Sequence, residues 1–345
     1  MSAGHQEAGG EGTAPSLPPL AISLGDPAGI GPEVVAKSWD ARHSLSLPPF
    51  AAVGDPRSIA AVWDGPLAII SDPREAEGAF ERGLPLIAVP AQGADIPGHP
   101  TVAGAHCSLD SLELAVGLAR SGSCSAVVTG PVSKHQLYSI GFSHPGQTEF
   151  VAERCGVSPR NVAMMLAGPT LRTVPVTTHM PLSDVFGALT SALIEARGRA
   201  TLRGLQRNFG LAEPRLAVAG LNPHAGESGA LGREEIEIIA PAIEALRAEG
   251  WDVSGPHPAD TMFHTFARAN FDAALCMYHD QALIPLKALH FEEGVNMTLG
   301  LPIVRTSPDH GTAFDIAGED RADPRAMAAA IRMAASCARH RTLHA

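Results

Sequence analysis

The chain has few aromatic residues and few charged ones, and these shortages narrow its structural class. Only 5% of its 345 residues are aromatic and 18% are charged, whereas 45% are hydrophobic. The core must therefore be packed mainly by Ala, Leu and Val, and the 35 Gly and 29 Pro indicate many turns. This composition is typical of an α/β enzyme and excludes a disordered or fibrous protein.

Basic residues are also scarce. There are 25 Lys and Arg against 36 Asp and Glu, which gives a formal net charge of −11. General nucleic-acid binding requires a basic surface that releases counterions, so we expect no nucleic-acid partner. A few local cations can still bind a small anionic substrate in an acidic chain.

Membrane and export signals are missing, and cysteine is rare. No apolar run approaches the ~20 residues of a membrane helix, and residues 1–18 contain no Lys or Arg. This start fits neither a signal nor a transit peptide and predicts a disordered tail. An odd, dispersed set of cysteines without CxxC predicts a soluble protein of a reducing compartment, the cytoplasm. The cysteines are Cys107, Cys124, Cys155, Cys276 and Cys337.

Three apolar runs end at a histidine. LRTVPVTTH ends at His179, RLAVAGLNPH ends at His224, and the run in LCMYHDQALIPLK ends at His279. The intervals of 45 and 55 residues leave room for a strand–helix–strand excursion. If the strands are neighbours, the imidazoles converge at one edge of the sheet, a layout that suits a catalytic divalent metal, typically Zn²⁺. The alternative is three unrelated polar loop residues.

Acidic side chains near these runs are candidate catalytic groups. Asp280 follows His279 directly, and it is either a general base or a group that orients the neighbouring imidazole. Asp260, in PADTMF, is either a base or a turn-forming residue. A cation, Lys287, follows in the same segment.

The remaining pattern indicates a mixed sheet with long helices. LAISLG predicts a strand that leads into a helix with Pro32 in its first turn, without a GxGxxG fingerprint. NVAMMLAGPTLRTVPVTTH predicts two antiparallel strands joined by a Gly-Pro turn. Periodic apolar residues predict helices over 109–120, 234–249 and the last 25 residues. Thr148 is the expected N-cap of a short helix whose start can bind an anion.

Nine motifs in order, spanning about residues 20–318, resemble the 4-hydroxythreonine-4-phosphate dehydrogenase family. HGTAFDIAG is also similar to HGSAPDIAG, the loop that holds the adenosine of NAD in β-decarboxylating dehydrogenases, and GIGPE resembles their N-terminal motif. The nine motifs are GDPAGIGPE, TGPVSK, HPGQTEF, TTHMPL, LNPHAGE, PADT, MYHDQALIPLK, GVNMTLGLPIVRTSPDHGTA and DIAG.

The resemblance implies a two-domain α/β/α sandwich of the isocitrate/isopropylmalate dehydrogenase-like type, with a mixed sheet and not a Rossmann fold. Residues 19–138 and 300–345 would form domain 1. Residues 139–299 would form domain 2, which carries the dimer contact and the metal ligands. The active site would lie at the interface of a homodimer.

The implied reaction is NAD- or NADP-dependent oxidation of 4-phosphooxy-L-threonine at C3, followed by loss of CO₂, on the route to pyridoxal phosphate. One divalent metal, Zn or alternatively Mg or Co, would be held by three histidines, one of them from the partner subunit. By residue matching, the metal ligands are His179, His224 and His279; the substrate anchors are Gln147, Thr148, Lys287, Asn296 and Arg305; the cofactor loop provides His310, Gly311, Thr312 and Asp315; and the candidate catalytic residues are Asp260, Asp280 and Lys287.

Other functions remain open on the residues alone. Many family members have His where this chain has Gln147, so a dehydrogenase of threonate or erythronate 4-phosphate is an alternative. The three histidines by themselves also fit a metal-dependent hydrolase, but a hydrolase has no use for an adenosine loop. A non-catalytic binding protein would not need three convergent metal ligands.

Overall fold

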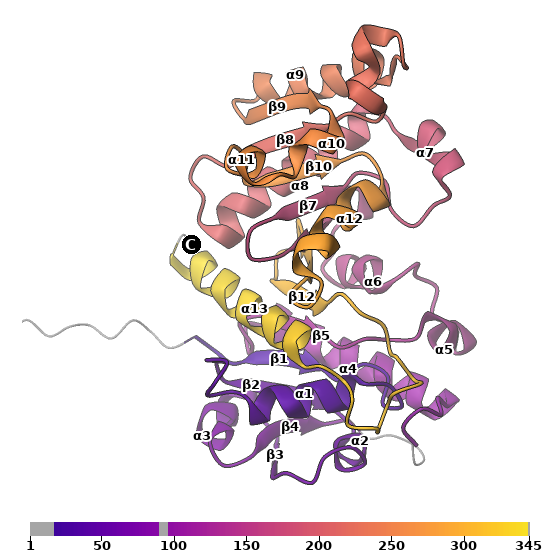
Figure 1. Ribbon diagram of the computed structural model, residues 1–345. Helices are drawn as coiled ribbons and strands as arrows, with labels where there is room; N and C mark the ends of the chain where they lie inside the picture. Colours follow the sequence, from indigo (N-terminus) through magenta and orange to yellow (C-terminus); the bar gives the residue numbers. More distant parts are fainter. Residues whose placement is uncertain (1–16, 90–95, 344–345) are drawn as a thin grey trace, which may run out of the picture.

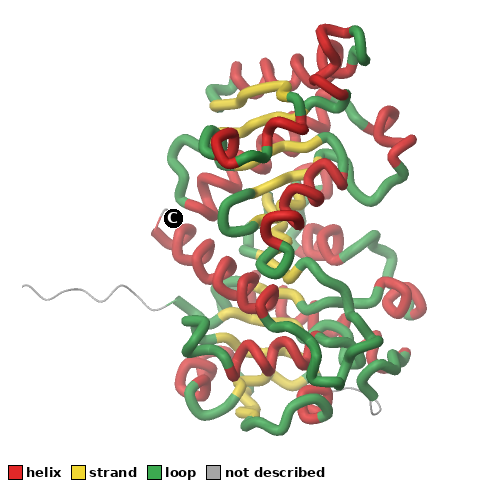
Figure 2. The backbone as a smooth tube through the Cα atoms, viewed as in Figure 1, coloured by secondary structure: helices red, strands yellow, loops and turns green. Residues whose placement is uncertain are grey.

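A computed structural model describes residues 17–89 and 96–343 of the chain. Their strands form one twelve-stranded sheet that runs through the long axis of the molecule (Figure 1). Helices flank the strands on both sides (Figure 2). The strand order is β3-β4-β2-β1-β5-β12-β11-β6-β7-β10-β8-β9. Of the predicted tail, residues 1–18, all but Leu17 and Pro18 lie outside the described residues.

The first half of the sheet is parallel and is built from both ends of the chain. β1 pairs with β2 and β5, and β12 returns from near the C-terminus to pair with β5. Every residue of β1 and β2 is buried, as expected for parallel strands covered on both faces. The strands of this half are β1 (Leu20–Ser23), β2 (Phe50–Gly54), β3 (Leu67–Ile70), β4 (Leu84–Ala88), β5 (Val127–Thr129) and β12 (Arg305–Pro308).

The second half begins with antiparallel strands. β11 pairs antiparallel with β12 and β6, and β6 pairs antiparallel with β7 across the Gly168–Pro169 turn. The predicted mixed sheet and its Gly-Pro hairpin are thus confirmed. Beyond β7 the sheet is parallel again. The strands of this half are β6 (Ala163–Ala167), β7 (Arg172–Pro175), β8 (Arg215–Ala219), β9 (Asp252–His257), β10 (Ala273–Cys276) and β11 (Val295–Leu299).

The sheet carries a hydrophobic core on each face. Side chains alternate along a strand, so Ile22 of β1 packs into one core cluster and Ala21 into another. The three-layer α/β/α arrangement is therefore confirmed. One face is covered by α1 (Gly31–Asp40), α8 (Ser191–Phe209), α9 (Ala240–Ala248) and α13 (Arg325–Leu343), and the other by α4 (Val102–Arg120), α6 (Gln147–Arg154), α10 (Ala259–Met262) and α12 (His279–His290).

The predicted helices are present, with shifted starts. α4 begins earlier than the expected residue 109, because the hydroxyl of Thr101 accepts a hydrogen bond from the Gly104 N–H (2.9 Å) and caps the helix. The helix predicted over 234–249 begins with a π-helical turn. The shorter elements are α2 (Pro56–Ala60), α3 (Ala76–Phe80), α5 (Lys134–Ser139), α7 (Leu182–Ala188), α11 (Thr265–Arg268), the 3₁₀ segments η1 (Pro73–Glu75), η2 (Pro159–Asn161) and η3 (Pro223–Gly229), and the π-turn η4 (Glu235–Ile239).

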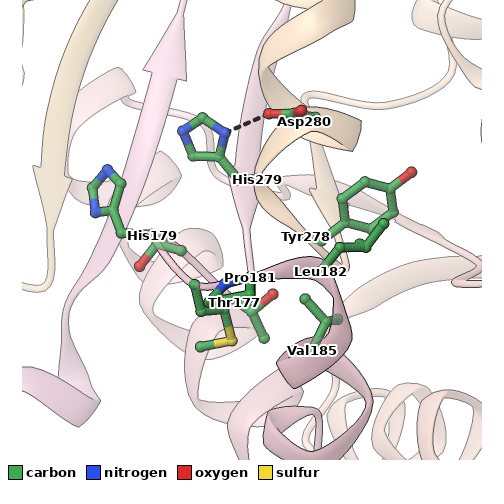
Figure 3. A pocket seen from close by; sticks show the side chains of 10 residues that line it. Thr177, His179, Pro181, Leu182, Val185, Tyr278, His279 and Asp280 are labelled. Atoms are coloured by element: carbon green, nitrogen blue, oxygen red, sulfur yellow. Dashed lines mark hydrogen bonds and ion pairs between the residues drawn. The ribbon is translucent and has the colours of Figure 1, made fainter.

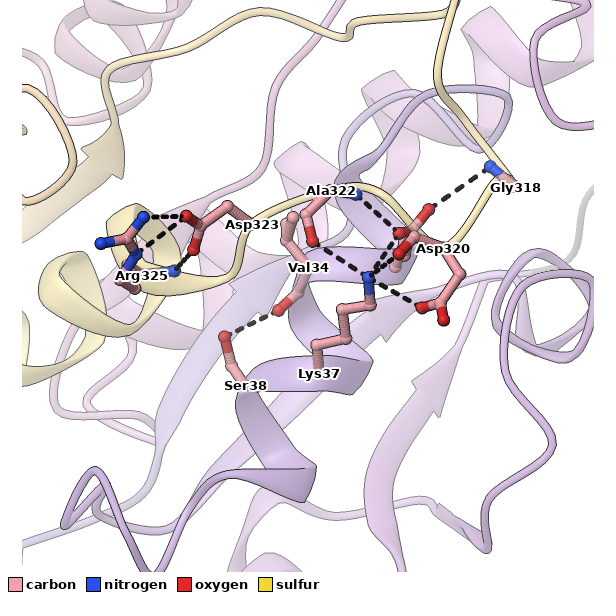
Figure 4. Close-up of polar contacts among 9 residues, drawn as sticks. Val34, Lys37, Ser38, Gly318, Asp320, Ala322, Asp323 and Arg325 are labelled. Atoms are coloured by element: carbon pink, nitrogen blue, oxygen red, sulfur yellow. Dashed lines mark hydrogen bonds and ion pairs between the residues drawn. The ribbon is translucent and has the colours of Figure 1, made fainter.

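A polar cluster ties the C-terminal segment to α1 (Figure 4). The buried carboxylate of Glu33 accepts hydrogen bonds from the N–H groups of Gly318 (3.3 Å) and Ala322 (3.0 Å). Lys37 pairs with Glu33 at 2.8 Å. It also donates to the carbonyl oxygens of Asp320 (2.9 Å) and Ala322 (3.0 Å). Residues 318–322 are therefore fixed against the N-terminal helix.

The two predicted domains would divide this sheet between β12 and β11. The sheet is continuous there, and α6 packs Phe150 into the same core cluster as Leu112 of α4. The domain boundaries stay a prediction. All five cysteines are free, and no helix of the described residues is long and apolar enough to cross a membrane.

Candidate active site

The three strands that lead to the predicted metal ligands are neighbours. β10 lies between β7 and β8 and is parallel to both, so their carboxyl ends meet at one edge of the sheet. Gln281 joins two of these ends, since its amide donates to the Gly220 carbonyl (2.8 Å) and accepts from the Met277 N–H (2.6 Å). The sequence indicated the strand ends but not this role of Gln281, which depends on the pairing of β10 with β8.

Two of the three histidines lie close together. The rings of His179 and His279 are 5.6 Å apart, and Figure 3 shows both at the same edge. The Nδ1 atom of His279 lies 2.7 Å from a carboxylate oxygen of Asp280. His224 is exposed on η3 and lines neither hollow at this edge. Within residues 17–89 and 96–343 of one chain, no three acidic, His or Cys side chains form a metal site.

The backbone at two of the predicted ligands is left-handed. φ is 46° at His179 and 52° at His224, a conformation that non-glycine residues adopt at a cost of about 1–3 kcal/mol. η3 continues with positive φ through Ser228. The buried carboxylate of Glu235 holds the start of this loop through the N–H groups of Leu221 (2.8 Å) and Asn222 (2.7 Å). Such conformations concentrate at functional sites.

A cleft of about 520 Å³ contains every predicted substrate anchor. It is formed by residues of β5, β6, β11, β12, α6 and α12, and it also reaches His179 and His279. One chain therefore places the anchors and two predicted metal ligands in the same space. The anchors that line the cleft are Gln147, Thr148, Lys287, Asn296 and Arg305.

Arg305 is a buried cation, and no carboxylate of the described residues forms an ion pair with it. It is 4% exposed, and its guanidinium donates to the hydroxyl groups of Thr129 (2.7 Å) and Thr298 (3.3 Å). Its Nε has no partner among the described residues. Burial lowers the pKa of Arg305 to about 10, an effect that Glu149 partly opposes. A buried charge with only neutral acceptors is stabilised by an anion, so this position favours an anionic ligand.

Gln147 contacts Arg305 through its side chain. Its amide oxygen accepts from Arg305 (3.1 Å), and its amide nitrogen donates to the Gly130 carbonyl (3.1 Å). Gln147 thus spans from the end of β5 to the arginine. The expected N-cap at Thr148 is wrong, because α6 begins at Gln147 and its N-cap is Gly146. The residues of the first turn still line the cleft, and the N–H groups of a helix start favour an anion.

The other cleft residues include charged side chains and a buried polar atom without a hydrogen-bond partner among the described residues. Lys287 pairs with Asp309 at 2.9 Å, and the buried side-chain oxygen of Asn296 has no hydrogen-bond partner in the described chain. Lys134, which follows β5, also lines the cleft. Burial lowers the pKa of His179, and the charges of Lys134 and His279 lower it further. Asp260, in contrast, is exposed on α10 and does not line the cleft.

The predicted cofactor loop enters the cleft at its start. His310 and Gly311 line the cleft, and the buried Nε2 of His310 has no partner among the described residues. The Thr312 carbonyl accepts from the N–H of Ile30 (2.9 Å). A side chain at Gly29 would meet that carbonyl at 2.9 Å, so the close approach requires glycine. Asp315 is exposed further along the loop.

The family described as "Pyridoxal phosphate biosynthetic protein PdxA" matches residues 49–334. The chain belongs to this family. A PdxA relative from Zymomonas mobilis subsp. mobilis, named 4-hydroxythreonine-4-phosphate dehydrogenase, is 54% identical over 329 residues, which cover 95% of this chain and 98% of the relative. A relative of the same name from Erythrobacter litoralis is 55% identical, with 94% and 97% covered. The predicted family and its role in pyridoxal phosphate biosynthesis are confirmed.

Solved structures agree with this PdxA fold. The crystal structure of 4-hydroxythreonine-4-phosphate dehydrogenase from Klebsiella pneumoniae has 38% identity and a TM-score of 0.83, with 93% of this chain and 99% of that chain covered. Terephthalate 1,2-cis-dihydrodiol dehydrogenase from Burkholderia xenovorans has 30% identity and a TM-score of 0.64, with 93% and 98% covered. The PdxA scaffold is therefore shared with a dehydrogenase that is named for a different substrate.

Proposed function

We propose that the chain oxidises 4-phosphooxy-L-threonine at C3 with NAD or NADP, and that the β-keto acid then loses CO₂ to give 3-amino-2-oxopropyl phosphate. The observation that carries this proposal is Arg305, a buried cation in the cleft without a carboxylate partner among the described residues. The names of the PdxA relatives support the same substrate. A phosphate is the anion that best matches the arginine together with the start of α6.

The chain's own residues bind and orient this substrate. Arg305 and the first-turn N–H groups of α6 hold the phosphate, with Thr148 as a further donor. Lys287 offsets the charge of the carboxylate, and Asn296 offers an unpaired amide oxygen to the amino group. Fixing both ends of a four-carbon substrate leaves its C3 hydroxyl beside the histidines, which lowers the entropic part of the barrier.

The histidines fit a divalent metal with nitrogen ligands. Asp280 bonds to Nδ1 of His279, which leaves Nε2 of that ring free for a metal, so we assign Asp280 an orienting role. The lowered pKa keeps His179 in the neutral form that binds metal. Imidazole ligands favour Zn²⁺ over Mg²⁺, with Co²⁺ as a further possibility. When bound, the metal supplies Lewis-acid stabilisation of the alkoxide and of the enolate left by CO₂.

We propose that His224 reaches this site from a second copy of the chain in a homodimer. Within one chain it is exposed on η3, apart from the His179–His279 pair. η3 contacts α10, so Asp260 would arrive beside His224 and act there as the general base. Large apolar side chains are exposed close to the pair, as expected of a surface that another subunit covers. They are Leu182 and Phe186 of α7 and Ile284 of α12.

The loop after β12 fits a dinucleotide. His310 presents an unpaired buried nitrogen, and the Glu33–Lys37 cluster fixes the following residues, which limits the ordering cost of binding. We propose that His310, Gly311, Thr312 and Asp315 hold NAD or NADP, which accepts the hydride. The hydrolase alternative leaves this loop without a purpose.

The sugar-acid phosphate alternative depends on Gln147. Both polar ends of its side chain bond within the protein, to Arg305 and Gly130. Gln147 is therefore occupied with the phosphate anchor Arg305, and a role beside the substituent on C2 is not needed to explain it, which supports the amino acid phosphate as substrate. The cytoplasmic location belongs to the same proposal and is supported by the five free thiols.

A substrate panel tests the proposal. The purified protein is assayed with NAD and NADP against 4-phosphooxy-L-threonine, 4-hydroxy-L-threonine and D-threonate 4-phosphate, with reduced cofactor followed by absorbance and products by mass spectrometry. We expect the amino acid phosphate to give the highest kcat/KM and to release CO₂. A preference for the threonate would overturn the substrate, and equal turnover without phosphate would overturn the role of Arg305.

A further inference from the structure

A second cationic hollow lies away from the candidate active site, on the face of the sheet covered by α8 and α13. It measures about 460 Å³ and contains four arginine side chains in a protein whose net charge is −11. Its floor includes Gly300 and Leu301, which directly follow β11. We name it the arginine groove; its arginines are Arg199, Arg203, Arg207 and Arg341.

Three of these arginines share one face of α8. Arg199, Arg203 and Arg207 recur every four residues, a spacing that brings like charges together and destabilises an isolated helix. Among the described residues, Arg199 is the one of the three that forms ion pairs, with Glu195 and Glu249 at 2.6 Å each, and the charge of Glu249 also acts on Arg203. Arg203 and Arg207 are exposed and form no ion pair or hydrogen bond within the described residues.

The fourth arginine is held rigidly by neutral groups. Arg341 donates to the side-chain oxygen of Asn208 (2.7 Å) and to the carbonyls of Pro302 (2.6 Å) and Leu301 (3.2 Å). Burial, and to a lesser extent the charge of Arg207, lowers the pKa of Arg341 to about 10. The groove thus gathers cations that repel one another, and within the described residues no carboxylate pairs with Arg207 or Arg341.

We propose that the arginine groove binds a phosphorylated small molecule with at least two negative charges, at a site separate from the substrate cleft. Guanidinium groups match phosphate oxygens in a bidentate manner. The volume falls within the roughly 300–1,000 Å³ of small-molecule sites. Arg341 is already fixed in place, so binding orders few side chains. The amide of Asn161 adds a polar group to the lining.

Titration calorimetry with inorganic pyrophosphate at low ionic strength tests this site. We compare the unmodified protein with Arg203→Gln/Arg207→Gln and with a charge-matched control, Arg82→Gln/Arg120→Gln, whose arginines are exposed elsewhere. Loss of two charged contacts should weaken pyrophosphate binding at the groove about a hundredfold. The control and Arg305→Ala should both retain it. Unchanged kcat/KM in the groove variant shows that its fold is intact.

A parallel titration with ADP separates inorganic phosphate from a nucleotide as the source of the charge. Equal affinity for ADP and pyrophosphate would show that the groove recognises the phosphates alone. Tighter binding of ADP would show that the groove also contacts the nucleoside. Equal pyrophosphate binding by the groove variant and its control would overturn the proposal, as would loss of all binding in Arg305→Ala. Absence of pyrophosphate binding to the unmodified protein would overturn it as well.

Discussion

The phosphate end of the cleft and the histidine edge differ in how completely one chain builds them. Around Arg305 one chain supplies three polar contacts, since Thr129, Thr298 and Gln147 all bond to its guanidinium. At the edge, His179 and His279 lie 5.6 Å apart and no third ligand joins them within the described residues. The polar groups around Arg305 thus come from one chain, whereas the described residues of one chain bring together only two of the three predicted metal ligands.

The backbone shows the same contrast. Arg305 belongs to β12, where pairing with β5 and β11 on either side fixes its direction. His179 and His224 lie in loops with positive φ, a conformation that persists only where surrounding contacts hold it. A regular strand can pre-form a buried charge site, whereas a strained loop gains from a ligand or a partner that completes it.

Removing a ligand at the histidine edge should have the largest effect. His279→Ala should lower kcat by about a thousandfold or more, because Lewis-acid stabilisation is worth several kcal/mol. Metal content, measured by mass spectrometry of the purified protein, should fall in parallel. His43→Ala, an exposed histidine far from the edge, is the control. A His279→Ala enzyme with full metal and near-normal rate would remove this residue from the ligand set.

Mixing two inactive variants tests whether the metal site is shared. If His224 comes from the second copy, a dimer of one His224→Ala and one His279→Ala chain keeps one intact site. Random exchange should then restore about a quarter of normal activity, since half of the dimers are mixed and each has one working site. Activity is measured before and after subunit exchange. No recovery despite demonstrated exchange would place all three ligands in one chain.

The phosphate end of the cleft around Arg305 should respond differently from the histidine edge. Arg305→Ala should lower kcat/KM by a factor that corresponds to about 2–4 kcal/mol of transition-state stabilisation, because a charge-assisted contact to a desolvated phosphate is lost. Metal content should stay normal, which separates this variant from those at the edge. Arg305→Lys keeps the positive charge but loses the bidentate guanidinium. Its kcat/KM should lie between those of the unmodified protein and Arg305→Ala. A variant equally active on the phosphorylated substrate would show that the anion binds elsewhere.

A smaller loss is expected at Gln147. Gln147→Ala removes one hydrogen-bond acceptor from Arg305. It should reduce kcat/KM for the phosphorylated substrate by a factor that corresponds to about 1–2 kcal/mol of transition-state stabilisation. The effect should appear mainly in KM, because Arg305 keeps its positive charge and only its position changes. Turnover of 4-hydroxy-L-threonine, which has no phosphate, is the control and should not change. A change of substrate preference in this variant would instead connect Gln147 with the substituent on C2.

A change to pH 6.5 should have the smallest effect of the series, and stronger acid should affect the histidine edge before the cleft. The pKa of His179 lies below its ordinary value of 6.5, chiefly because of burial, so the ring stays neutral at pH 6.5 and protonates only at lower pH. Metal should therefore be retained at pH 6.5 and released as the pH falls further. Sulfate serves as a probe of the anion site at Arg305. Its binding should persist at the lower pH, because the pKa of Arg305 is about 10. Simultaneous loss of metal and sulfate would contradict this separation.

Sequence pattern predicted the sheet better than it predicted the loops. The apolar runs before His179 and His279 identified strands, because hydrophobic pattern carries that information, whereas their parallel pairing is seen only in the structure. It could not show that His224 stands apart, because the left-handed course of η3 depends on Glu235 reaching back to Asn222. The bridge formed by Gln147 was equally hidden, since it requires Gly130 and Arg305 to approach from distant parts of the chain.

The cluster around Glu33 has a consequence for the order in which the protein forms during synthesis. Its backbone partners, Gly318 and Ala322, are translated almost 300 residues after α1. Until they emerge from the ribosome, a carboxylate that is buried in the finished fold stays in water, and α1 lacks its final contacts. Long-range pairing of this kind slows folding. The N-terminal half of the sheet is thus made first, but it becomes complete only at the end of translation.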